Sequence, residues 1–193
     1  MRTGTRAAAG AVVLLVAALL AGLVWWAVAQ RVPRALWDAV DPPPPEACSV
    51  ADPTTSGCLT PTARRLHDAA VARFGEPGRD APVRAVTCWS EHAWNPSSDH
   101  PQGRACDFFP GAFGEFAAGD DLANGWAVAQ WLRDDAAELG VRYVIWQGRI
   151  WYRGGGDAGD GWGRPYGGGG VYDPQDATGG HFDHVHVSVL PRS

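Results

Sequence analysis

The sequence predicts an α+β domain, in which a small antiparallel sheet has flanking helices and a long apolar segment precedes the domain. Several segments alternate apolar and polar residues as strands do, and two of them flank Gln147-Gly148, a two-residue turn typical of a hairpin. Two other segments repeat apolar residues at helical spacing. The expected strands are 83–89, 104–109, 143–146, 149–152 and 184–189, and the expected helices are 61–74 and 121–139.

Composition narrows the classes of function. The chain has 193 residues, of which 46% are hydrophobic, enough for the core of one domain with an appendage. All 16 basic residues are Arg, and 21 acidic residues give a net charge of -5. General nucleic-acid binders are usually basic, so no nucleic-acid partner is expected. The absence of Lys also excludes Schiff-base chemistry and a phosphate-loop lysine.

Residues 1–29 have the pattern of a membrane-targeting segment. Arg2 and Arg6 precede an uncharged run over 7–29, which as a helix would span roughly 35 Å, enough for a bilayer core. The run ends in Ala27-Val28-Ala29, a pattern typical of signal-peptide cleavage. Two interpretations remain open: a single-pass anchor in the cell membrane, or a signal peptide whose removal yields a secreted protein. Both place the rest of the chain outside the cytoplasm.

Residues 30–59 are interpreted as a Pro-rich tether that precedes a domain over 60–193. Four consecutive prolines over 42–45 would form a stiff, extended spacer. Cys48 and Cys58 follow, and in an oxidising compartment they are expected to close a small loop.

Capping residues mark the expected helix boundaries. Thr60 can cap the first helix, with Pro61 at its first position and Gly75 after its end. Gly140 can end the second helix.

A Gly-rich loop over 154–170 follows the hairpin, and loops of this length are usually functional or mobile. Two aromatic residues of this loop are candidates for a binding groove: Trp162 and Tyr166.

The candidate functional residues lie in two short motifs. The first is S-D-H-P-Q-G-R-A-C-D, from Ser98 to Asp107, in which a turn at 101–103 can bring His100 close to Asp107. The second is H-V-H at 184–186. Because a strand places alternate residues on one face, both of its imidazoles share a face and the valine points to the other.

The residue types in these motifs suit a metal site. Two His and one carboxylate are a common ligand set for catalytic Zn²⁺, with a fourth position left for water. A zinc site made of Cys is disfavoured, since the chain has no C-x-x-C pair and an oxidising compartment favours disulfides. Two other histidines are expected to be solvated: His67 and His92.

Together the motifs resemble those of the LAS metallopeptidases. Ser98, His100, Gly103, Ala105 and Asp107 match S-x-H-x-x-G-x-A-x-D, and an H-x-H follows. This group includes D-alanyl-D-alanine carboxypeptidases and dipeptidases, penicillin-insensitive murein endopeptidases and the hedgehog signalling domain. The resemblance covers roughly residues 83–190 and implies a hedgehog/DD-peptidase-like fold. The chain also resembles small exported bacterial proteins that have this domain near the C-terminus.

The resemblance assigns roles to individual residues. His100, Asp107 and His186 would be the zinc ligands. His184 would be catalytic and would handle the proton of the metal-bound water, at a position where the murein endopeptidase branch has His and many carboxypeptidases have Glu. Three further residues would lie around the ligands and fix their orientation: Ser98, Asp183 and His181.

One feature departs from the family pattern. Members that act on D-Ala-D-Ala usually have an Arg in the strand before the first motif, in a G-Y-R-like sequence. The corresponding segment here reads V-T-C-W-S over 86–90, and Arg84 lies upstream of it. The cation that would bind the substrate carboxylate or the transition state is therefore unassigned, which weakens a carboxypeptidase interpretation more than an endopeptidase one.

The other two cysteines lie on either side of the turn in the first motif. Cys88 and Cys106 belong to the expected strands 83–89 and 104–109, so a bridge between them would stiffen the strand of Asp107. Such a bridge would stabilise the fold by roughly 3 kcal/mol on the chain-entropy model. Four cysteines allow three pairings, and the sequence does not decide among them.

The leading expectation is an exported, membrane-tethered zinc peptidase that hydrolyses the peptide part of peptidoglycan. Its partners would be cell-wall peptides, and the membrane through the N-terminal helix. One alternative is a non-catalytic zinc domain that binds the cell wall or a protein. Another is a structural envelope protein without tightly bound metal.

Overall fold

A computed structural model describes residues 18–23, 25–26, 45–92, 94–95, 97–159 and 161–191 of the chain. Most of the expected anchor or signal segment, and the tether up to residue 44, lie outside these ranges. Within the described ranges, no helix combines the length and the apolar character needed to cross a bilayer. The chain divides into two units, and the second begins at Pro45 and contains all the elements below.

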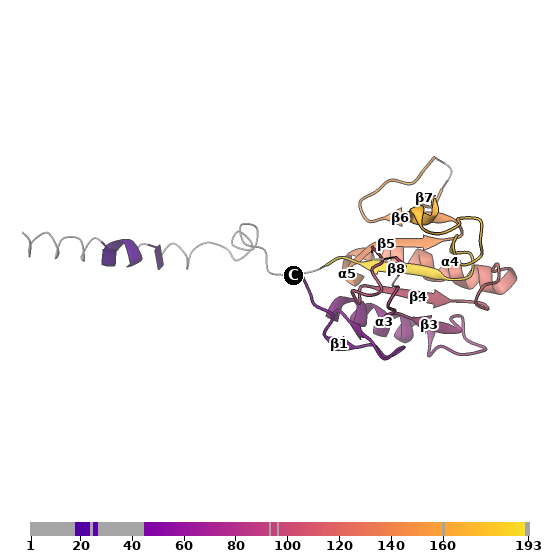
Figure 1. The fold of residues 1–193 in the computed structure, drawn as a ribbon, viewed down its shortest axis with the longest axis horizontal. Helices are drawn as coiled ribbons and strands as arrows, with labels where there is room; N and C mark the ends of the chain where they lie inside the picture. The colour runs from indigo at the N-terminus through magenta and orange to yellow at the C-terminus, as the bar shows by residue number, and fades with distance from the viewer. Residues whose placement is uncertain are drawn as a thin grey trace, which may run out of the picture. The chain divides into compact units, whose positions relative to one another are not determined.

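The expected α+β class with an antiparallel sheet is confirmed. The described residues form a six-stranded sheet in the order β3-β4-β8-β5-β6-β7, in which all neighbouring pairs are antiparallel (Figure 1). Its strands are β3 (Ala85–Thr87), β4 (Ala105–Phe109), β5 (Val141–Trp146), β6 (Arg149–Tyr152), β7 (Arg164–Pro165) and β8 (Val185–Val189). The helices of this unit are α3 (Pro61–Phe74), α4 (Gly119–Asp134), α5 (Ala136–Leu139) and the short 3-10 turn η1 (Gly168–Gly170).

Capping explains where the helices begin and end. The Thr60 hydroxyl accepts a hydrogen bond from the backbone N–H of Ala63 at 3.2 Å, and α3 ends at Gly75, as expected. The expected helix over 121–139 is instead two helices, because Asp135 leaves the helical conformation (φ -96°, ψ 15°) between α4 and α5. Gly140 ends α5 in the left-handed conformation that glycine adopts most easily.

The two faces of the sheet differ in chemistry. One face packs against α3 and α4 and contributes Phe108, Val144 and the three valines of β8 to the hydrophobic core. Because side chains alternate along a strand, the residues between them point to the opposite face. That opposite face carries Asp107 of β4, Tyr143 of β5 and His186 of β8, and it forms the wall of a cavity. The sheet thus separates an apolar core from a polar site.

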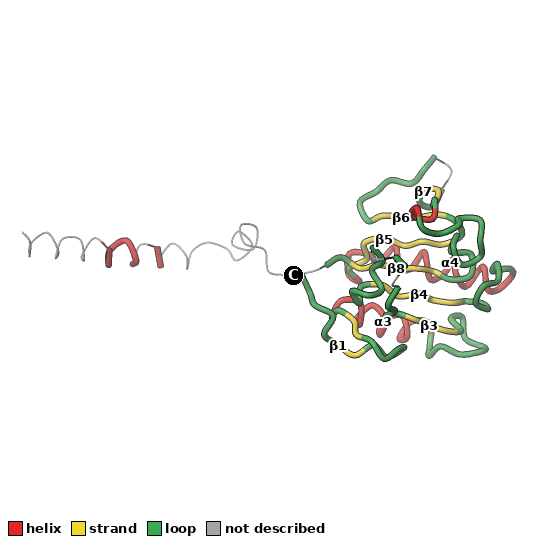
Figure 2. Tube along the Cα trace, in the orientation of Figure 1, coloured by secondary structure: helices red, strands yellow, loops and turns green. Residues whose placement is uncertain are grey.

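Four short elements were not predicted. A two-stranded sheet pairs β1 (Val50–Ala51) with β2 (Cys58–Leu59) next to the Cys48–Cys58 bridge, so this loop belongs to the compact unit that begins at Pro45. In addition, β7 and η1 lie within the Gly-rich segment, which is otherwise loop between β6 and β8 (Figure 2). These elements have only two or three residues each, too few for a hydrophobic period to show.

Candidate metal centre

Three side chains of the two motifs converge on one point. Asp107 of β4 and His186 of β8 are direct partners across the two adjacent central strands, and His100 lies in the turn before β4. Asp107 Oδ1 is 2.8 Å from His186 Nδ1, and Asp107 Oδ2 is 3.3 Å from His100 Nε2. The ligand atoms of the three residues all lie within 4.8 Å of one another, so they could hold a metal ion. The structure therefore brings the expected ligands together.

The turn that carries His100 depends on Gly103. The backbone N–H of Gly103 donates to the carbonyl of His100 at 2.9 Å, and Gly103 has a positive φ of 65°. Its Cα lies against Cys48 Sγ and the backbone carbonyl of Cys58, where a Cβ atom would not fit. A glycine is needed here for both its backbone conformation and its size. The Cys48–Cys58 loop thus packs directly on the motif.

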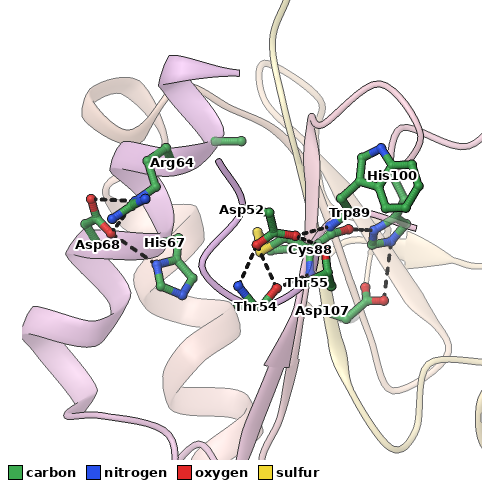
Figure 3. Close-up of a disulfide and its surroundings, with 12 residues drawn as sticks. Asp52, Thr54, Thr55, Arg64, His67, Asp68, Cys88, Trp89, His100 and Asp107 are labelled. Atoms are coloured by element: carbon green, nitrogen blue, oxygen red, sulfur yellow. Dashed lines mark hydrogen bonds and ion pairs between the residues drawn. A yellow bond between two sulfur atoms is a disulfide. The ribbon is translucent and has the colours of Figure 1, made fainter. Parts of the chain in front are cut away.

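The second disulfide fixes the orientation of the His100 ring. His100 Nδ1 hydrogen-bonds to the backbone carbonyl of Cys88, which is joined to Cys106 in β4 (Figure 3). A carbonyl only accepts, so Nδ1 carries a proton and donates it to Cys88, which leaves Nε2 facing Asp107. Both expected disulfides are present, and each contacts the segment between the ligands.

Asp52 anchors the end of the strand that supplies this carbonyl. Its carboxylate accepts hydrogen bonds from the Trp89 backbone N–H at 2.8 Å, the Thr55 hydroxyl at 2.6 Å and the Thr54 hydroxyl at 2.8 Å (Figure 3). The Thr54 hydroxyl in turn accepts from the Cys88 backbone N–H at 3.0 Å. The chain before α3 therefore holds the backbone that orients His100.

A second buried network supports His186. Its Nε2 lies 3.2 Å from the hydroxyl of Ser188, which also hydrogen-bonds to Asp99. Asp99 is only 4% exposed; it accepts from the Tyr143 hydroxyl at 3.2 Å and pairs with Arg104 at 2.6 Å. The Tyr143 ring stacks on the His186 ring with 5.5 Å between centroids. The support residues Ser188, Asp99 and Tyr143 were not predicted, although Ser188 shares the strand face of His186.

His184 lies next to the ligand cluster and is held by Asp183. Its Nδ1 is 2.5 Å from Asp183 Oδ1, while its Nε2 is 3.7 Å from Asp107 Oδ1. The other oxygen of Asp183 accepts from the Gly114 backbone N–H and the Thr178 hydroxyl, each at 2.8 Å. With Nδ1 donating to this fixed carboxylate, Nε2 faces the metal position and is able to exchange a proton there.

The remaining expected site residues lie around this centre. The Ser98 hydroxyl accepts from the backbone N–H of His100 at 3.3 Å and so acts on the turn. His181 is 7% exposed, has a positive φ of 59° and packs 4.6 Å from the His184 ring, centroid to centroid. The expectation for His92 was wrong, because its ring stacks on His100 at 4.9 Å. The expectation of a solvated His67 was also wrong, because this histidine is buried, at 7% exposure.

Opposing charges control ionisation at this centre. Burial would raise the pKa of Asp107, but the imidazoles of His100 and His184 outweigh it and hold this pKa well below its usual range. Burial alone would lower the pKa of His100, yet the Asp107 carboxylate raises it to about 9. For His181, burial and the neighbouring imidazoles leave the pKa well below the ordinary value. The Asp107 carboxylate is therefore ionised. A bound metal cation would take the place of the imidazole protons that this carboxylate now attracts.

The metal centre opens into a cavity of about 550 Å³. Its walls come from the sheet face, the segment around His92 and the Gly-rich segment, which contributes Tyr166. Trp162, the other groove candidate, packs instead against the core and the Trp126 ring. Arg142 is the one Arg among the described residues that line the cavity, and it lies 3.5 Å from Asp99. Arg84 pairs with Asp121 at 2.6 Å and is not part of this lining.

Comparison with known proteins gives a family for the chain. No curated protein and no solved structure matches it. A family model described as VldE, C-terminal domain, matches residues 55–177. The matched segment includes His100 and Asp107 and ends before the H-x-H motif of β8. Since the match covers more than half of the sequence, the chain belongs to the VldE C-terminal domain family.

Proposed function

We propose that this protein is an exported zinc peptidase of the LAS type that hydrolyses peptide bonds of peptidoglycan. The observation that carries the proposal is the convergence of His100, Asp107 and His186 beside His184, in a cavity large enough for a peptide segment. The order and spacing of the two motifs, as in the LAS metallopeptidases, support the same conclusion.

The donor set fits zinc. Two imidazole nitrogens and one carboxylate oxygen are three protein ligands, the number found in catalytic zinc sites that keep one position for water. The ring nitrogens that do not face the centre are occupied by the Cys88 carbonyl and the Ser188 hydroxyl, as is usual around bound zinc. When bound, zinc would polarise the scissile carbonyl and lower the pKa of its water towards about 7.

The side chains of this protein would perform the proton transfer. His184 Nε2 would accept a proton on the metal side and return it to the leaving amine, while Nδ1 keeps its hydrogen bond to Asp183. Asp183 does not face the metal position; its contacts with Gly114 and Thr178 hold it as the partner of His184. Asp183 is thus a positioning residue, and His184 is the catalytic one.

Export and tethering are part of the proposal. Two disulfides suit an oxidising compartment outside the cytoplasm, and Arg2 and Arg6 before the apolar run support membrane targeting. A membrane anchor would hold the domain near the wall, whereas cleavage after Ala29 would release it.

The direct test is digestion of purified muropeptides by the zinc-loaded chain, with and without a chelator. We expect cleavage that stops on chelation, returns with zinc and is lost in His186→Ala. His67→Ala is the matched control, because this histidine is also buried but lies on α3, outside the cavity lining. Cleavage that persists without metal, or in His186→Ala, would show that the mechanism is wrong.

A second function is favoured by one observation. Arg142, the one Arg among the described lining residues, already pairs with buried Asp99, so its charge is partly compensated. A zinc domain that binds cell wall without cleaving it would need no further cation. Stoichiometric zinc and retention on insoluble peptidoglycan, with no product in the digest, would identify this alternative.

A further inference from the structure

The two most exposed aromatic side chains of the cavity lining stand at its mouth. Trp94 is 68% exposed and Phe113 is 74% exposed, and both belong to the cavity lining. Large apolar side chains are normally buried, so a pair left in water beside a cavity marks a surface where a ligand packs.

Two rows of neighbouring rings connect these side chains with the candidate metal centre. On one side, Trp94 lies 4.9 Å from His92, and His92 lies 4.9 Å from the ligand His100. On the other side, Phe113 lies 5.9 Å from Phe109, which in turn lies 5.1 Å from His184. These are distances between ring centroids. A ligand at the metal position therefore has an aromatic surface extending outwards on two sides.

The exposed part of the lining is almost free of charge. Apart from Arg142, its exposed members are all uncharged: Thr87, Trp94, Ser97, Phe113, Tyr152, Gly169 and Val171. The ionised groups lie deeper, at the metal centre and in the Asp99 network. The mouth thus suits a neutral ligand with apolar faces and uncharged polar edges, whereas an anionic polymer would meet a chain of net charge -5.

We propose that Trp94 and Phe113 bind N-acetylated sugar rings of the glycan, so that the enzyme acts on stem peptides still attached to their sugars. This inference rests on the proposed function, because it names the part of peptidoglycan that the mouth recognises. Stem peptides contain mainly small or charged side chains, which offer little apolar surface to two large aromatic rings. An N-acetylated pyranose has an apolar face of C–H groups, neutral hydroxyl and acetamido groups at its edge, and no charge.

Polar groups next to Trp94 match the edge of such a ring. The Ser97 hydroxyl donates to Asn95 Oδ1 at 2.7 Å, and Asn95 Nδ2 donates to the Tyr172 hydroxyl at 3.1 Å. These uncharged groups all line the cavity and are able to exchange hydrogen bonds with hydroxyl and acetamido groups. An aromatic face with neutral hydrogen-bonding neighbours is thus present on the Trp94 side.

The first experiment compares two substrates for the zinc-loaded full chain: a disaccharide muropeptide and the same peptide released from its sugars. We expect kcat/KM to be at least about fivefold higher for the muropeptide, mainly through KM, since an aromatic contact of this kind contributes more than about 1 kcal/mol. Trp94→Ala and Phe113→Ala should each reduce this ratio. Phe116→Ala should leave it unchanged, because Phe116 is 60% exposed but lies outside the cavity lining. Equal kcat/KM for both substrates would overturn the inference.

A binding measurement separates this inference from the proposed function. A tetramer of N-acetylglucosamine, which contains no peptide bond to cleave, is titrated into the zinc-loaded chain and its variants. We expect saturable binding that weakens in Trp94→Ala and Phe113→Ala and persists in Phe116→Ala. Sugar binding without any muropeptide cleavage would reject the peptidase and retain the glycan surface. Cleavage without sugar binding would reject the glycan surface and retain the peptidase.

Discussion

Removal of one hydroxyl group, that of Ser188, should weaken metal binding without disturbing the fold. Ser188 is fully buried, and its hydroxyl connects His186 Nε2, at 3.2 Å, with the carboxylate of Asp99. In Ser188→Ala the ring N–H of His186 loses this acceptor, and the Asp99 carboxylate loses one donor. His186 then becomes a less basic and less firmly oriented metal ligand.

The magnitude follows from what remains after the substitution. Loss of a hydrogen-bond partner behind a metal ligand typically lowers metal affinity by about 10- to 100-fold, or roughly 1.4–2.7 kcal/mol. Tyr143 still stacks on the His186 ring, and Asp99 keeps its bonds to Tyr143 and Arg104. We therefore expect the lower end of the range, about a tenfold weaker affinity for zinc.

The assay is a competition titration in which a chromophoric chelator and the protein share a limited amount of zinc. Ser97→Ala is the matched control, because the Ser97 hydroxyl bonds to Asn95 and lies in the exposed part of the lining. Ser188→Ala with the zinc affinity of the unmodified chain would refute the reasoning, and so would an equal loss of affinity in both variants.

Three further predictions concern stability and catalysis. Hydrogen bonds from Thr55, Trp89 and Thr54 outweigh the effect of burial and lower the pKa of Asp52. The ionised Asp52 carboxylate therefore stabilises the fold fully above about pH 4, and this stabilisation disappears as the pH falls. In urea unfolding, Asp52→Asn should cost about 1–3 kcal/mol at pH 7 and less at pH 3; equal costs would contradict this. Replacement of the bridged pair Cys88 and Cys106 by Ala should remove roughly 3 kcal/mol of stability and weaken zinc binding, and unchanged zinc affinity would count against the role of the bridge. Asp183→Asn should lower kcat at least about tenfold at unchanged KM and zinc content, and a loss of zinc would instead make Asp183 a support of the metal.

The sequence predicted those parts of the fold that local patterns determine. Thr60, Pro61 and Gly75 act only on their neighbours in the chain, and helix α3 has the predicted bounds. The alternation in β8 correctly separated the core valines from His186. The break at Asp135 was missed, because the apolar stripe continues through it and only the backbone shows the interruption.

The site was predicted in its ligands and in the nearby Ser98, Asp183 and His181, but not in the Asp99 and Asp52 networks. His100, Asp107 and His186 have residue types and spacing that point to a metal, and the structure brings them together. The contacts of Asp99 with Ser188 and of Asp52 with Trp89 join segments far apart in the sequence. Such pairs have no local signature, since any Ser or Asp has a solvated alternative. The ring stacking of His92 on His100 was missed for the same reason.

The position of β8 has a consequence for the stage of synthesis at which the candidate metal ligands can meet. This strand lies between β4 and β5, so before it is synthesised the sheet consists of two separate halves. Asp107 and His186 are 79 residues apart in the sequence yet are direct neighbours in the sheet. Contacts between such distant segments form late in folding. A growing chain therefore cannot bring His100, Asp107 and His186 together until β8 has left the ribosome.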